Sequence, residues 1–481
     1  MLLKRIYDTT LAQASYLVGC QATGEALVID PNRDVEQYLR AAADEGLRVT
    51  HVTETHIHAD FVSGARELAE RAGARLLLSA EGGRDWQYAF ASDAGATLLH
   101  HGDRFMVGNL KLDVLHTPGH TPEHLTFLVT DTPATDRPMA AFTGDFIFVG
   151  DVGRPDLLEK AAKVIGTMDD AARTLFHSLR RFVAGQPDYL QLFPGHGAGS
   201  ACGKALGAVP STTLGYEKIA NWGLTTTDEE EFVRTVLDGQ PEPPDYFAEM
   251  KRVNRAGPAR LGGLPHPPRL TFDDLLSRVA RGEAIVDTRP AARFAGAHVP
   301  GTINIPLGRS FSTWAGSLLS YDRPFTLIVE GGDGGDAARA LAMIGLDRLA
   351  GVYDASLVDA WKASGRAIAT VKRVSAATLD RRMADGEVAV IDVRGQAEWV
   401  AGHLPGVPNI PLAALAHRLD ELPRDVPIVV HCQSGARSAI AASLLHARGR
   451  TDSMDLEDGY AGWVRAGLPT VVEPRAVTAT T

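Results

Sequence analysis

The chain is poor in cysteine, has no long apolar run and holds fewer basic than acidic residues. Its three cysteines, Cys20, Cys202 and Cys432, are too few and odd in number for a disulfide framework in a chain of 481 residues, which favours a reducing compartment. No run of about 18 apolar residues occurs, so a membrane-spanning helix is not expected. The opening MLLKRIYDTT lacks the apolar segment and cleavage site of a signal peptide. We therefore expect a cytoplasmic location.

The shortage of positive charge also bears on partners. Lysine and arginine number 48 against 59 aspartates and glutamates, a net charge of −11, which disfavours nucleic acid or an anionic membrane as a partner. Apolar residues make up 45% and charged residues 22%, as in ordinary globular proteins, which excludes a disordered or fibrous chain. At roughly 100–200 residues per domain, the length predicts about three domains.

The first 250 residues alternate short apolar runs with turns and amphipathic stretches, which predicts a layered α/β domain. Helices are expected at 59–73, which ends at Gly73, and at 168–184. A linker is predicted at 251–268, where GPARLGG and PHPP concentrate glycine and proline. Strands are expected at 25–30, 48–55, 75–80, 111–116, 124–131 and 188–195.

Two segments after the linker, 269–370 and 371–475, repeat each other. AIVDTRPAARFAGAHVPGTINIPL in the first and AVIDVRGQAEWVAGHLPGVPNIPL in the second align at an offset of 105 residues. The offset matches an aspartate, an arginine and a histidine in each copy. Two copies of one domain of about 100 residues are therefore predicted.

Four strand-end loops of the first domain carry histidine or aspartate. They are THIHAD with His56, His58 and Asp60, HTPGHTPEH with His120, FTGDF with Asp145, and FPGHG with His196. Such loops gather at one edge of a sheet, where ligands commonly bind. Imidazole and carboxylate groups suit zinc, iron or manganese, so a metal site is predicted.

The ordered motifs HxHxD, TPGHT, TGD and PGHG resemble the metallo-β-lactamase fold family over about residues 1–250. The resemblance implies an αββα sandwich with the metal at the edge between the two sheets. Hydrolases of the family, such as glyoxalase II, have HxHxDH and two metals. Phe61 replaces the final histidine here, which weakens the second site and favours a single metal.

Residues 143–157, TGDFIFVGDVGRPDL, resemble the persulfide dioxygenases of this fold. In those enzymes two histidines and one aspartate hold one iron(II), and the positions that match here are His56, His120 and Asp145. This ligand set leaves open positions, as non-haem iron oxygenases require. Zinc hydrolases also keep an open position, but zinc has no redox chemistry for dioxygen.

The resemblance also assigns roles around the metal. His58, Asp60 and His196 would orient the ligands and bound water, although His196 could equally be a remnant of the lost second site. Arg154 resembles a family arginine at the substrate mouth; the alternative is a salt bridge to Asp151 or Asp156. Cys202, six residues beyond His196, is a candidate sulfur acceptor. The slightly favoured alternative is a buried free cysteine.

A second chemical motif lies in the last repeat. In IVVHCQSGARSAIAASLL an apolar strand leads to Cys432, and the loop to Arg437 is followed by a helix. Backbone N–H groups of such a loop and the helix N-terminus favour thiolate over thiol. The block DxR…GHxPG…NIPL with CxxGxR resembles the rhodanese sulfurtransferases over 371–475. By that resemblance Cys432 would carry a persulfide and Arg437 would steer an anionic acceptor such as sulfite.

The middle repeat departs from this pattern. An ungapped alignment at an offset of 101 places Gly331 opposite Cys432 and Asp336 opposite Arg437. The nucleophile is missing and the charge at the rim is reversed. We therefore predict an inactive rhodanese-like domain at 269–370, serving as a spacer, docking surface or oligomer contact.

The order of the three parts resembles bacterial fusions of a persulfide dioxygenase with rhodanese domains, which act in sulfide detoxification. The resemblance implies one Fe(II) per chain, O2 and a small thiol persulfide, of glutathione, coenzyme A or similar, as reactants, and a homo-oligomer. Sulfite would form at the iron, and Cys432 would transfer sulfane sulfur to give thiosulfate. The rhodanese could instead make persulfide from thiosulfate.

Two alternatives stay open. One is a dinuclear zinc hydrolase of the glyoxalase II type fused to a rhodanese, against which Phe61 argues. The other is a sulfur carrier or adaptor with an inactive metal domain, which the joint presence of His56, His120 and Asp145 disfavours.

Overall fold

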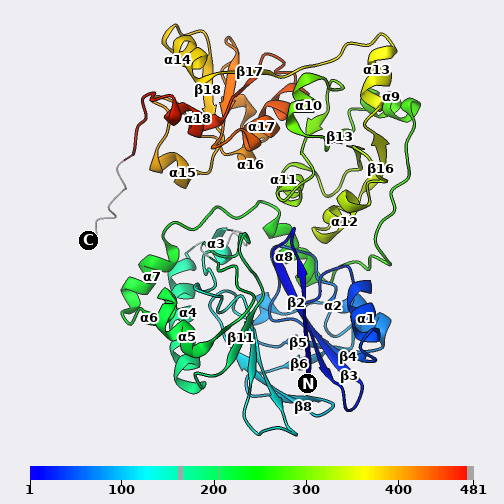
Figure 1. Cartoon of the computed structure of the whole chain (residues 1–481), viewed down its shortest axis with the longest axis vertical. Helices are drawn as coiled ribbons and strands as arrows, with labels where there is room; N and C mark the ends of the chain where they lie inside the picture. Colours follow the sequence, from blue (N-terminus) through cyan, green and yellow to red (C-terminus); the bar gives the residue numbers. More distant parts are fainter. Residues whose placement is uncertain (161–165, 205, 474–481) are drawn as a thin grey trace. The chain divides into compact units, whose positions relative to one another are not determined.

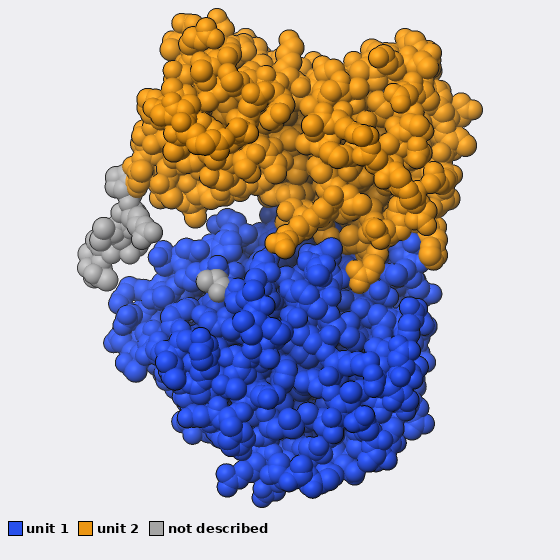
Figure 2. All heavy atoms as spheres, in the orientation of Figure 1, with its two compact units in different colours: residues 1–265, 342–345 blue, residues 266–341, 346–481 orange. Residues whose placement is uncertain are grey.

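The computed structural model describes residues 1–160, 166–204 and 206–473. The chain forms two compact units, shown in blue and orange in Figure 2. Unit 1 consists of Met1–Pro265 and Ala342–Gly345, and unit 2 of His266–Leu341 and Leu346–Thr481. Within the described residues, no helix is both long enough and apolar enough to cross a membrane.

Unit 1 contains two six-stranded sheets (Figure 1). The strands of the first sheet, in spatial order, are β1 (Leu2–Asp8), β2 (Gln13–Cys20), β3 (Glu25–Ile29), β4 (Arg48–Thr53), β5 (Arg75–Ser79) and β6 (Thr97–Leu99). Strands β1 to β3 pair antiparallel, and β3 to β6 pair in parallel. The second sheet has the order β12 (Thr212–Thr213), β11 (Gln191–Pro194), β10 (Ala140–Gly144), β9 (Leu125–Asp131), β8 (Leu110–His116) and β7 (Arg104–Val107). Only β10 and β11 pair in parallel in this sheet.

Alternating side chains pack the two sheets face to face. On β3, Leu27 and Ile29 join a core that includes Phe127 of β9, so they lie between the sheets. Val28 points the other way, into a core with Leu68 of a helix, as the period of two along a strand requires.

Helices cover the outer face of each sheet. The first carries α1 (Glu36–Ala43) and α2 (Ala65–Ala72), and the second carries α4 (Met168–Gly185) and α7 (Glu229–Leu237). The predicted αββα sandwich is therefore confirmed. Unit 1 also contains α3 (Leu157–Lys160), α5 (Leu214–Ala220), α6 (Trp222–Thr225), α8 (Phe247–Ala256) and the 3-10 turn η1 (Arg84–Trp86).

Two sequence-based expectations in unit 1 differ from the structure. The helix expected at 59–73 begins only at Ala65, because the preceding residues form the loop that carries the metal-site histidines. The linker predicted at 251–268 begins inside α8, and its next residues bind to α2: the backbone N–H groups of Leu261 and Gly262 donate to the Glu67 carboxylate at 2.6 and 3.0 Å. Glycine and proline here mark an irregular segment that is fastened to unit 1 as far as Pro265.

Unit 2 contains two parallel four-stranded sheets, one for each repeat. The first has the order β14 (Ile303–Asn304), β13 (Ala284–Asp287), β15 (Phe325–Val329), β16 (Leu349–Asp354), and the second β17 (Lys372–Val374), β20 (Met454–Leu456), β19 (Ile428–His431), β18 (Ala389–Asp392). The first repeat carries helices α9 (Phe272–Ala280), α10 (Ala291–Gly296), α11 (Phe311–Leu318), α12 (Gly335–Met343) and α13 (Leu357–Ala363). The second carries α14 (Ala376–Ala384), α15 (Gln396–Ala401), α16 (Leu412–Leu415), α17 (Ala436–Ala447), α18 (Gly459–Arg465) and the turn η2 (Leu419–Glu421).

The repeated sequence block makes the same contacts in both copies. Arg289 pairs with Asp287 and Arg394 pairs with Asp392, each at 2.6 Å and each buried. The histidine of each block stacks on an aromatic ring four residues earlier, with ring centroids 3.8 Å apart. The internal repeat is therefore confirmed; the end placed at residue 475 lies outside the described residues.

The strand register corrects the alignment of the middle repeat. Ile328 pairs with Asp287 as His431 pairs with Asp392, so Val329 occupies the position of Cys432, which the ungapped alignment gave to Gly331. The loop before α12 is longer than the loop before α17, which an ungapped alignment cannot represent. No cysteine falls at either position.

Candidate metal centre and sulfur-transfer loop

Three buried side chains of unit 1 converge at the edge of the sandwich. His56 follows β4, His120 follows β8, and Asp145 follows β10. The Nε2 atoms of His56 and His120 lie 3.9 and 3.5 Å from Asp145 Oδ2, and one ligand atom from each residue lies within 4.8 Å of the others.

The protein leaves Asp145 Oδ2 without a hydrogen-bond partner among the described residues, although this oxygen is buried. Buried carboxylate oxygens normally have a partner, so an unpaired one facing two imidazoles fits a bound cation. Two imidazoles and one carboxylate are a donor set for a divalent transition metal. The three residues form a metal-binding cluster.

The protonation states suit metal binding. Burial lowers the pKa of His120 to about 4 and that of His56 well below its ordinary value. Burial alone would raise the pKa of the Asp145 carboxyl, but the charge and hydrogen bond of His196 outweigh it and hold that pKa below its ordinary value. At neutral pH the imidazoles are thus neutral and the carboxylate is ionised, as ligands must be.

His196 connects the ligand Asp145 to Asp60. Its Nδ1 lies 2.7 Å from Asp145 Oδ1 and its Nε2 lies 2.8 Å from Asp60 Oδ2. Burial opposes its protonation, but the two carboxylates raise the pKa of His196 well above its ordinary value. A doubly protonated imidazole donates to both carboxylates and cannot itself bind a metal, so this arrangement favours the orienting role over the remnant.

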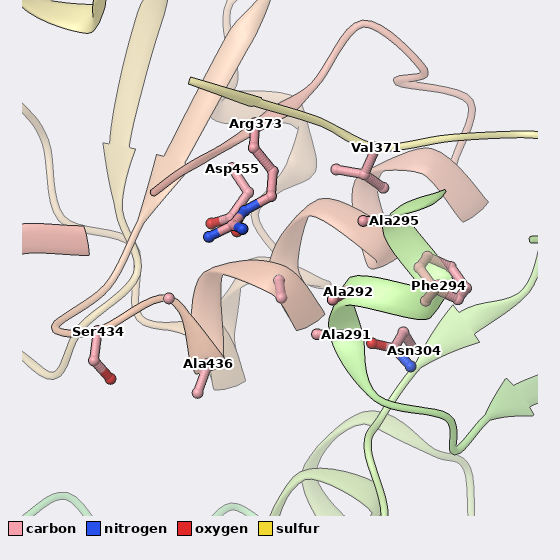
Figure 3. A pocket seen from close by; sticks show the side chains of 12 residues that line it. Ala291, Ala292, Phe294, Ala295, Asn304, Val371, Arg373, Ser434, Ala436 and Asp455 are labelled. Atoms are coloured by element: carbon pink, nitrogen blue, oxygen red, sulfur yellow. The ribbon is translucent and has the colours of Figure 1, made fainter. Parts of the chain in front are cut away.

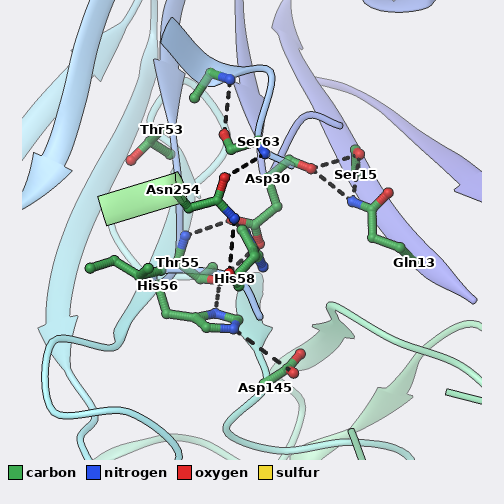
Figure 4. A network of polar contacts seen from close by, with 12 residues as sticks. Gln13, Ser15, Asp30, Thr53, Thr55, His56, His58, Ser63, Asp145 and Asn254 are labelled. Carbon is green, nitrogen blue, oxygen red and sulfur yellow. Dashed lines mark hydrogen bonds and ion pairs between the residues drawn. The ribbon is translucent and has the colours of Figure 1, made fainter. Parts of the chain in front are cut away.

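His58 belongs to a polar network that includes Ser15 of β2 and Asp30 at the end of β3 (Figure 4). Its Nε2 lies 3.1 Å from Asp30 Oδ1, and the same carboxylate accepts the N–H of Thr55 at 2.6 Å. The Asp30 carboxylate thus holds the backbone of Thr55 before His56 and the side chain of His58 after it. Asp30 was not predicted as a site residue, because only its place at the end of β3 brings it to this loop.

Asn254 of α8 binds the other side of this loop (Figure 4). Its Nδ2 donates to the carbonyl oxygens of His58 and Phe61 at 2.8 and 2.7 Å, and its Oδ1 accepts the Ser63 N–H at 2.9 Å. The sequence analysis missed Asn254 because it lies near the start of the predicted linker.

Two aromatic neighbours complete the surroundings of the cluster. Phe61, at the place of the missing histidine, is fully buried with its ring 4.4 Å from that of His58. His124 accepts the Asp145 N–H through Nε2 at 3.2 Å, and its ring stacks 5.2 Å from His56. His124 was missed as well, although HTPGHTPEH contains it.

Arg154 corrects a sequence-based prediction. Its side chain is 0% exposed and forms two bonds to Asp156, at 2.8 and 2.7 Å, and one each to the carbonyl oxygens of Ala201 and Pro241. The guanidinium is thus engaged within the protein, and the salt-bridge alternative with Asp156 replaces the substrate-binding assignment. Its backbone oxygen lies 3.0 Å from His120 Nδ1, where it orients that ligand.

Cys202 lies beside Asp60 and His196, with its sulfur within 4.8 Å of their ligand atoms. Burial first, then the negative charges of Asp60 and Asp145, raise the pKa of its thiol well above the ordinary value. A thiol held in the protonated form is a poor nucleophile, which favours the buried cysteine over the sulfur acceptor.

The loop around Cys432 lies in unit 2, between β19 and α17. The Cys432 sulfur accepts the Gly435 N–H at 3.1 Å and the Ser438 hydroxyl at 3.5 Å. Gly435 has φ +98°, which a side chain would strain, and α17 begins directly after it. Such placement at a helix N-terminus is typical of reactive cysteines.

Arg437 is paired rather than free to meet an anion. Its guanidinium binds both oxygens of Glu398 at 2.6 and 2.8 Å.

A pocket of about 280 Å³ adjoins the loop (Figure 3). It is lined by Ser434 and Ala436, by Ala291 and Ala292 of α10, and by Arg373 beside Asp455. Residues of both repeats therefore surround the approach to this loop.

Comparisons with known proteins agree with this architecture. The model of the metallo-β-lactamase superfamily matches residues 8–196, and that of the rhodanese-like domain matches 271–363 and 375–466. A metallo-β-lactamase structure from Staphylococcus aureus is 41% identical, with a TM-score of 0.66 over 74% of this chain and 99% of that one.

Curated relatives match just over half of the chain at lower identity. A probable metallo-hydrolase of Burkholderia pseudomallei is 29% identical over 56% of this chain and 95% of its own length. The mitochondrial persulfide dioxygenase ETHE1 of Bos taurus is 27% identical over 56% of this chain and 91% of its own length. The chain belongs to the metallo-β-lactamase superfamily, as an enzyme domain followed by two rhodanese-like domains in one polypeptide.

Proposed function

We propose that the chain is an iron(II) persulfide dioxygenase that also transfers sulfane sulfur. The observation that carries the proposal is the buried group of His56, His120 and Asp145, with an unpaired oxygen on Asp145. The similarity to ETHE1 supports the same activity. Bound iron(II) would supply the redox chemistry that dioxygen requires and that zinc lacks.

The chain's own residues would keep the ligands in place. His196 holds one oxygen of Asp145, and the carbonyl of Arg154 holds His120, so each ligand has a second contact that fixes its orientation. Phe61 leaves an apolar ring where a hydrolase has a further imidazole, which supports one metal per chain.

The proposed reactions balance as follows. At the first site, R–S–SH, O2 and water give R–SH, sulfite and two protons; the outer sulfur is oxidised and dioxygen is reduced. At the second, the Cys432 thiolate attacks the outer sulfur of another persulfide and releases the thiol. Sulfite then takes this sulfur from Cys432, forming thiosulfate and restoring the thiolate.

The test is metal analysis of the chain loaded anaerobically, followed by oxygen uptake when glutathione persulfide is added. We expect one iron per chain and one sulfite or thiosulfate formed per O2 consumed. Absence of oxygen uptake by iron-loaded protein would refute the proposal.

A dinuclear zinc hydrolase is the second candidate, because Asp60, His196 and Cys202 form another group of close ligand atoms. Hydrogen bonds at both nitrogens of His196 argue against it. Two zinc ions per chain together with cleavage of a glutathione thioester would support the hydrolase instead.

A further inference from the structure

The pocket beside the Cys432 loop is bounded by both repeats of unit 2. Its lining includes Ser434, Gly435 and Ala436 of the loop and Ala292 of α10 in the first repeat (Figure 3). Gly435 connects the pocket to the reactive sulfur, because its N–H donates to Cys432 Sγ at 3.1 Å. The first repeat, which has no cysteine of its own at this place, therefore contributes a wall beside the nucleophile of the second.

Hydrogen bonds hold this wall in place. The N–H of Val371, where the chain passes from one repeat to the next, donates to the carbonyl oxygen of Ala295 on α10 at 2.9 Å. The N–H of Asn304 donates to Ser443 Oγ of α17 at 2.9 Å. Ala295, Val371 and Asn304 all line the pocket, so the pocket is built into the packing of the two repeats.

Arg373 and Asp455 form the charged end of the pocket. They face each other on the neighbouring strands β17 and β20, and Arg373 Nε lies 3.6 Å from Asp455 Oδ2, too far for a hydrogen bond. Asp455 is 4% exposed, and its Oδ1 has no hydrogen-bond partner among the described residues. Buried carboxylate oxygens normally have a partner. Burial raises the pKa of Asp455 to about 6, so the carboxylate is mostly ionised at neutral pH and can accept a hydrogen bond from a ligand.

A ligand group with an ammonium beside a carboxylate complements this pair. The ammonium would donate to Asp455 Oδ1, and the carboxylate would accept from the guanidinium of Arg373, which gives two charge-assisted hydrogen bonds. The volume of about 280 Å³ is close to the lower limit of ordinary ligand pockets, about 300 Å³. Such a pocket suits the amino-acid end of a small thiol and is too small for the nucleotide of coenzyme A.

We propose that the pocket between the repeats binds the amino-acid end of a small thiol persulfide and presents its outer sulfur to Cys432, an inference that rests on the sulfur transfer of the proposed function. The Cys432 thiolate attacks the outer sulfur of R–S–SH. The bond between Sγ and that sulfur forms, the S–S bond of the donor breaks, and the thiol leaves as R–S⁻. The first repeat is then part of the substrate site of the second.

The test measures the loading of Cys432 with sulfur in the absence of oxygen. The full chain is mixed with glutathione persulfide, or with a capped form whose α-ammonium is acetylated and whose adjacent carboxylate is esterified. Intact mass follows the gain of one sulfur atom, and Cys432→Ser gives the background from the other two cysteines. Below saturation, wild type should load at least about tenfold faster from the uncapped donor than from the capped one.

Variants of the charged pair should lose this preference. In Arg373→Met and Asp455→Asn the ratio of the two rates falls to about one. Lys372→Met is the matched control, because it removes a positive charge from the next, exposed position of β17, which lies on the opposite face of the strand; its ratio should equal that of wild type. A wild-type ratio near one, or a ratio that survives in both variants of the pair, would overturn the proposal.

A substitution in the first repeat tests the wall. Ala292→Trp adds bulk at an exposed position of α10 that lines the pocket, and loading from glutathione persulfide should slow at least about tenfold. Arg293→Trp adds the same ring at the next position of the helix, where the side chain is 66% exposed and pairs with Glu330; it should load like wild type. Equal rates in these two variants would contradict a wall supplied by the first repeat.

The loading assay is independent of the metal centre, because neither iron nor O2 takes part in it. Selective loading of Cys432 by a protein that consumes no O2 when loaded with iron would refute the proposed dioxygenase and leave the pocket standing. Loading that is indifferent to the caps and to the variants would overturn the pocket alone. Oxygen uptake by a wild type whose Cys432 gains no sulfur would refute the sulfur transfer and the pocket together.

Discussion

His196 shows how one side chain sets the state of another in the metal cluster. Its imidazolium donates to both Asp60 and Asp145, and its charge and hydrogen bond hold the pKa of the Asp145 carboxyl below its ordinary value although that group is buried. The other oxygen of Asp145, Oδ2, lies 3.9 and 3.5 Å from the Nε2 atoms of His56 and His120 and has no hydrogen-bond partner among the described residues.

Replacement of the carboxylate tests the cluster itself. Asp145→Ala removes the one anionic ligand, and we expect the affinity for iron to fall by at least about 100-fold, with loss of oxygen uptake. Metal content after gel filtration and oxygen consumption measure this. Asp113→Ala, on the same unit but in a surface pair with Arg104, should keep its iron; equal iron in both variants would rule out Asp145 as a ligand.

Arg154 gives a prediction about stability. Arg154→Met removes the two buried hydrogen bonds that the guanidinium donates to Asp156, and we expect a loss of about 3–5 kcal/mol in the free energy of unfolding. Arg173→Met, which breaks an exposed pair with Glu230, should change the free energy of unfolding far less, because solvent screens a surface ion pair. Denaturant unfolding compares the two. A stable Arg154→Met with a raised KM would restore the substrate-binding role.

Among single residues, the sequence predicts those that lie in a recognisable motif. His56, His120 and Asp145 follow strands, so their convergence at one edge could be expected, and the structure brings them together. Asp30, His124 and Asn254 could not be predicted as partners, because each depends on a contact between segments that only folding brings together. For Arg154 the sequence alone does not decide between substrate binding and a salt bridge to a nearby aspartate, because both roles need only a guanidinium at that position.

Among the elements, α8 is the one whose role in the structure differs most from the role that its sequence predicts. Its glycine- and proline-rich surroundings predict a linker, yet its buried face supplies Asn254 to the metal-site loop. Local composition reports where regular structure stops; it does not report whether the segment is fastened to a domain. By contrast, six strands of the sandwich, β3, β4, β5, β8, β9 and β11, follow from their apolar runs, because both faces of each sheet are covered.

Asn254→Ala tests this element. The substitution leaves the carbonyl oxygens of His58 and Phe61 and the N–H of Ser63 without their partner, so we expect a loss of about 3 kcal/mol in unfolding free energy and about tenfold weaker iron binding. Thermal unfolding and metal titration are the measurements. Arg255→Ala on the same helix is the control; identical behaviour of both variants would show that α8 does not support the loop.

For the whole molecule, the two chemical sites lie in different units, so their activities should be separable. Cys432→Ser should leave oxygen uptake within about twofold of wild type, because no residue of the metal cluster changes, while sulfite accumulates in place of thiosulfate. Ion chromatography of the products distinguishes these anions. Cys20→Ser, at a cysteine far from both sites in the sequence, should still yield thiosulfate. Loss of oxygen uptake in Cys432→Ser would contradict independent sites.

The overall architecture was accessible from the sequence for two reasons. The four histidine- and aspartate-bearing motifs occur in a fixed order, and the Asp–Arg–His block repeats at a constant offset; both correspond to contacts in the structure. The loop before α12 was misaligned because its extra residues carry no signal in an ungapped comparison.

The helix that follows Cys432 packs against the first rhodanese-like repeat. Helix α17 is buried along most of its length, with β14 and α10 of the first repeat against it. The Ser443 hydroxyl donates to the Ile440 carbonyl of its own helix at 2.7 Å and accepts the backbone N–H of Asn304 at 2.9 Å. The first repeat thus covers part of the helix that follows the Cys432 loop. Excised by itself, the C-terminal domain would present an alanine-rich surface to solvent and tend to self-associate.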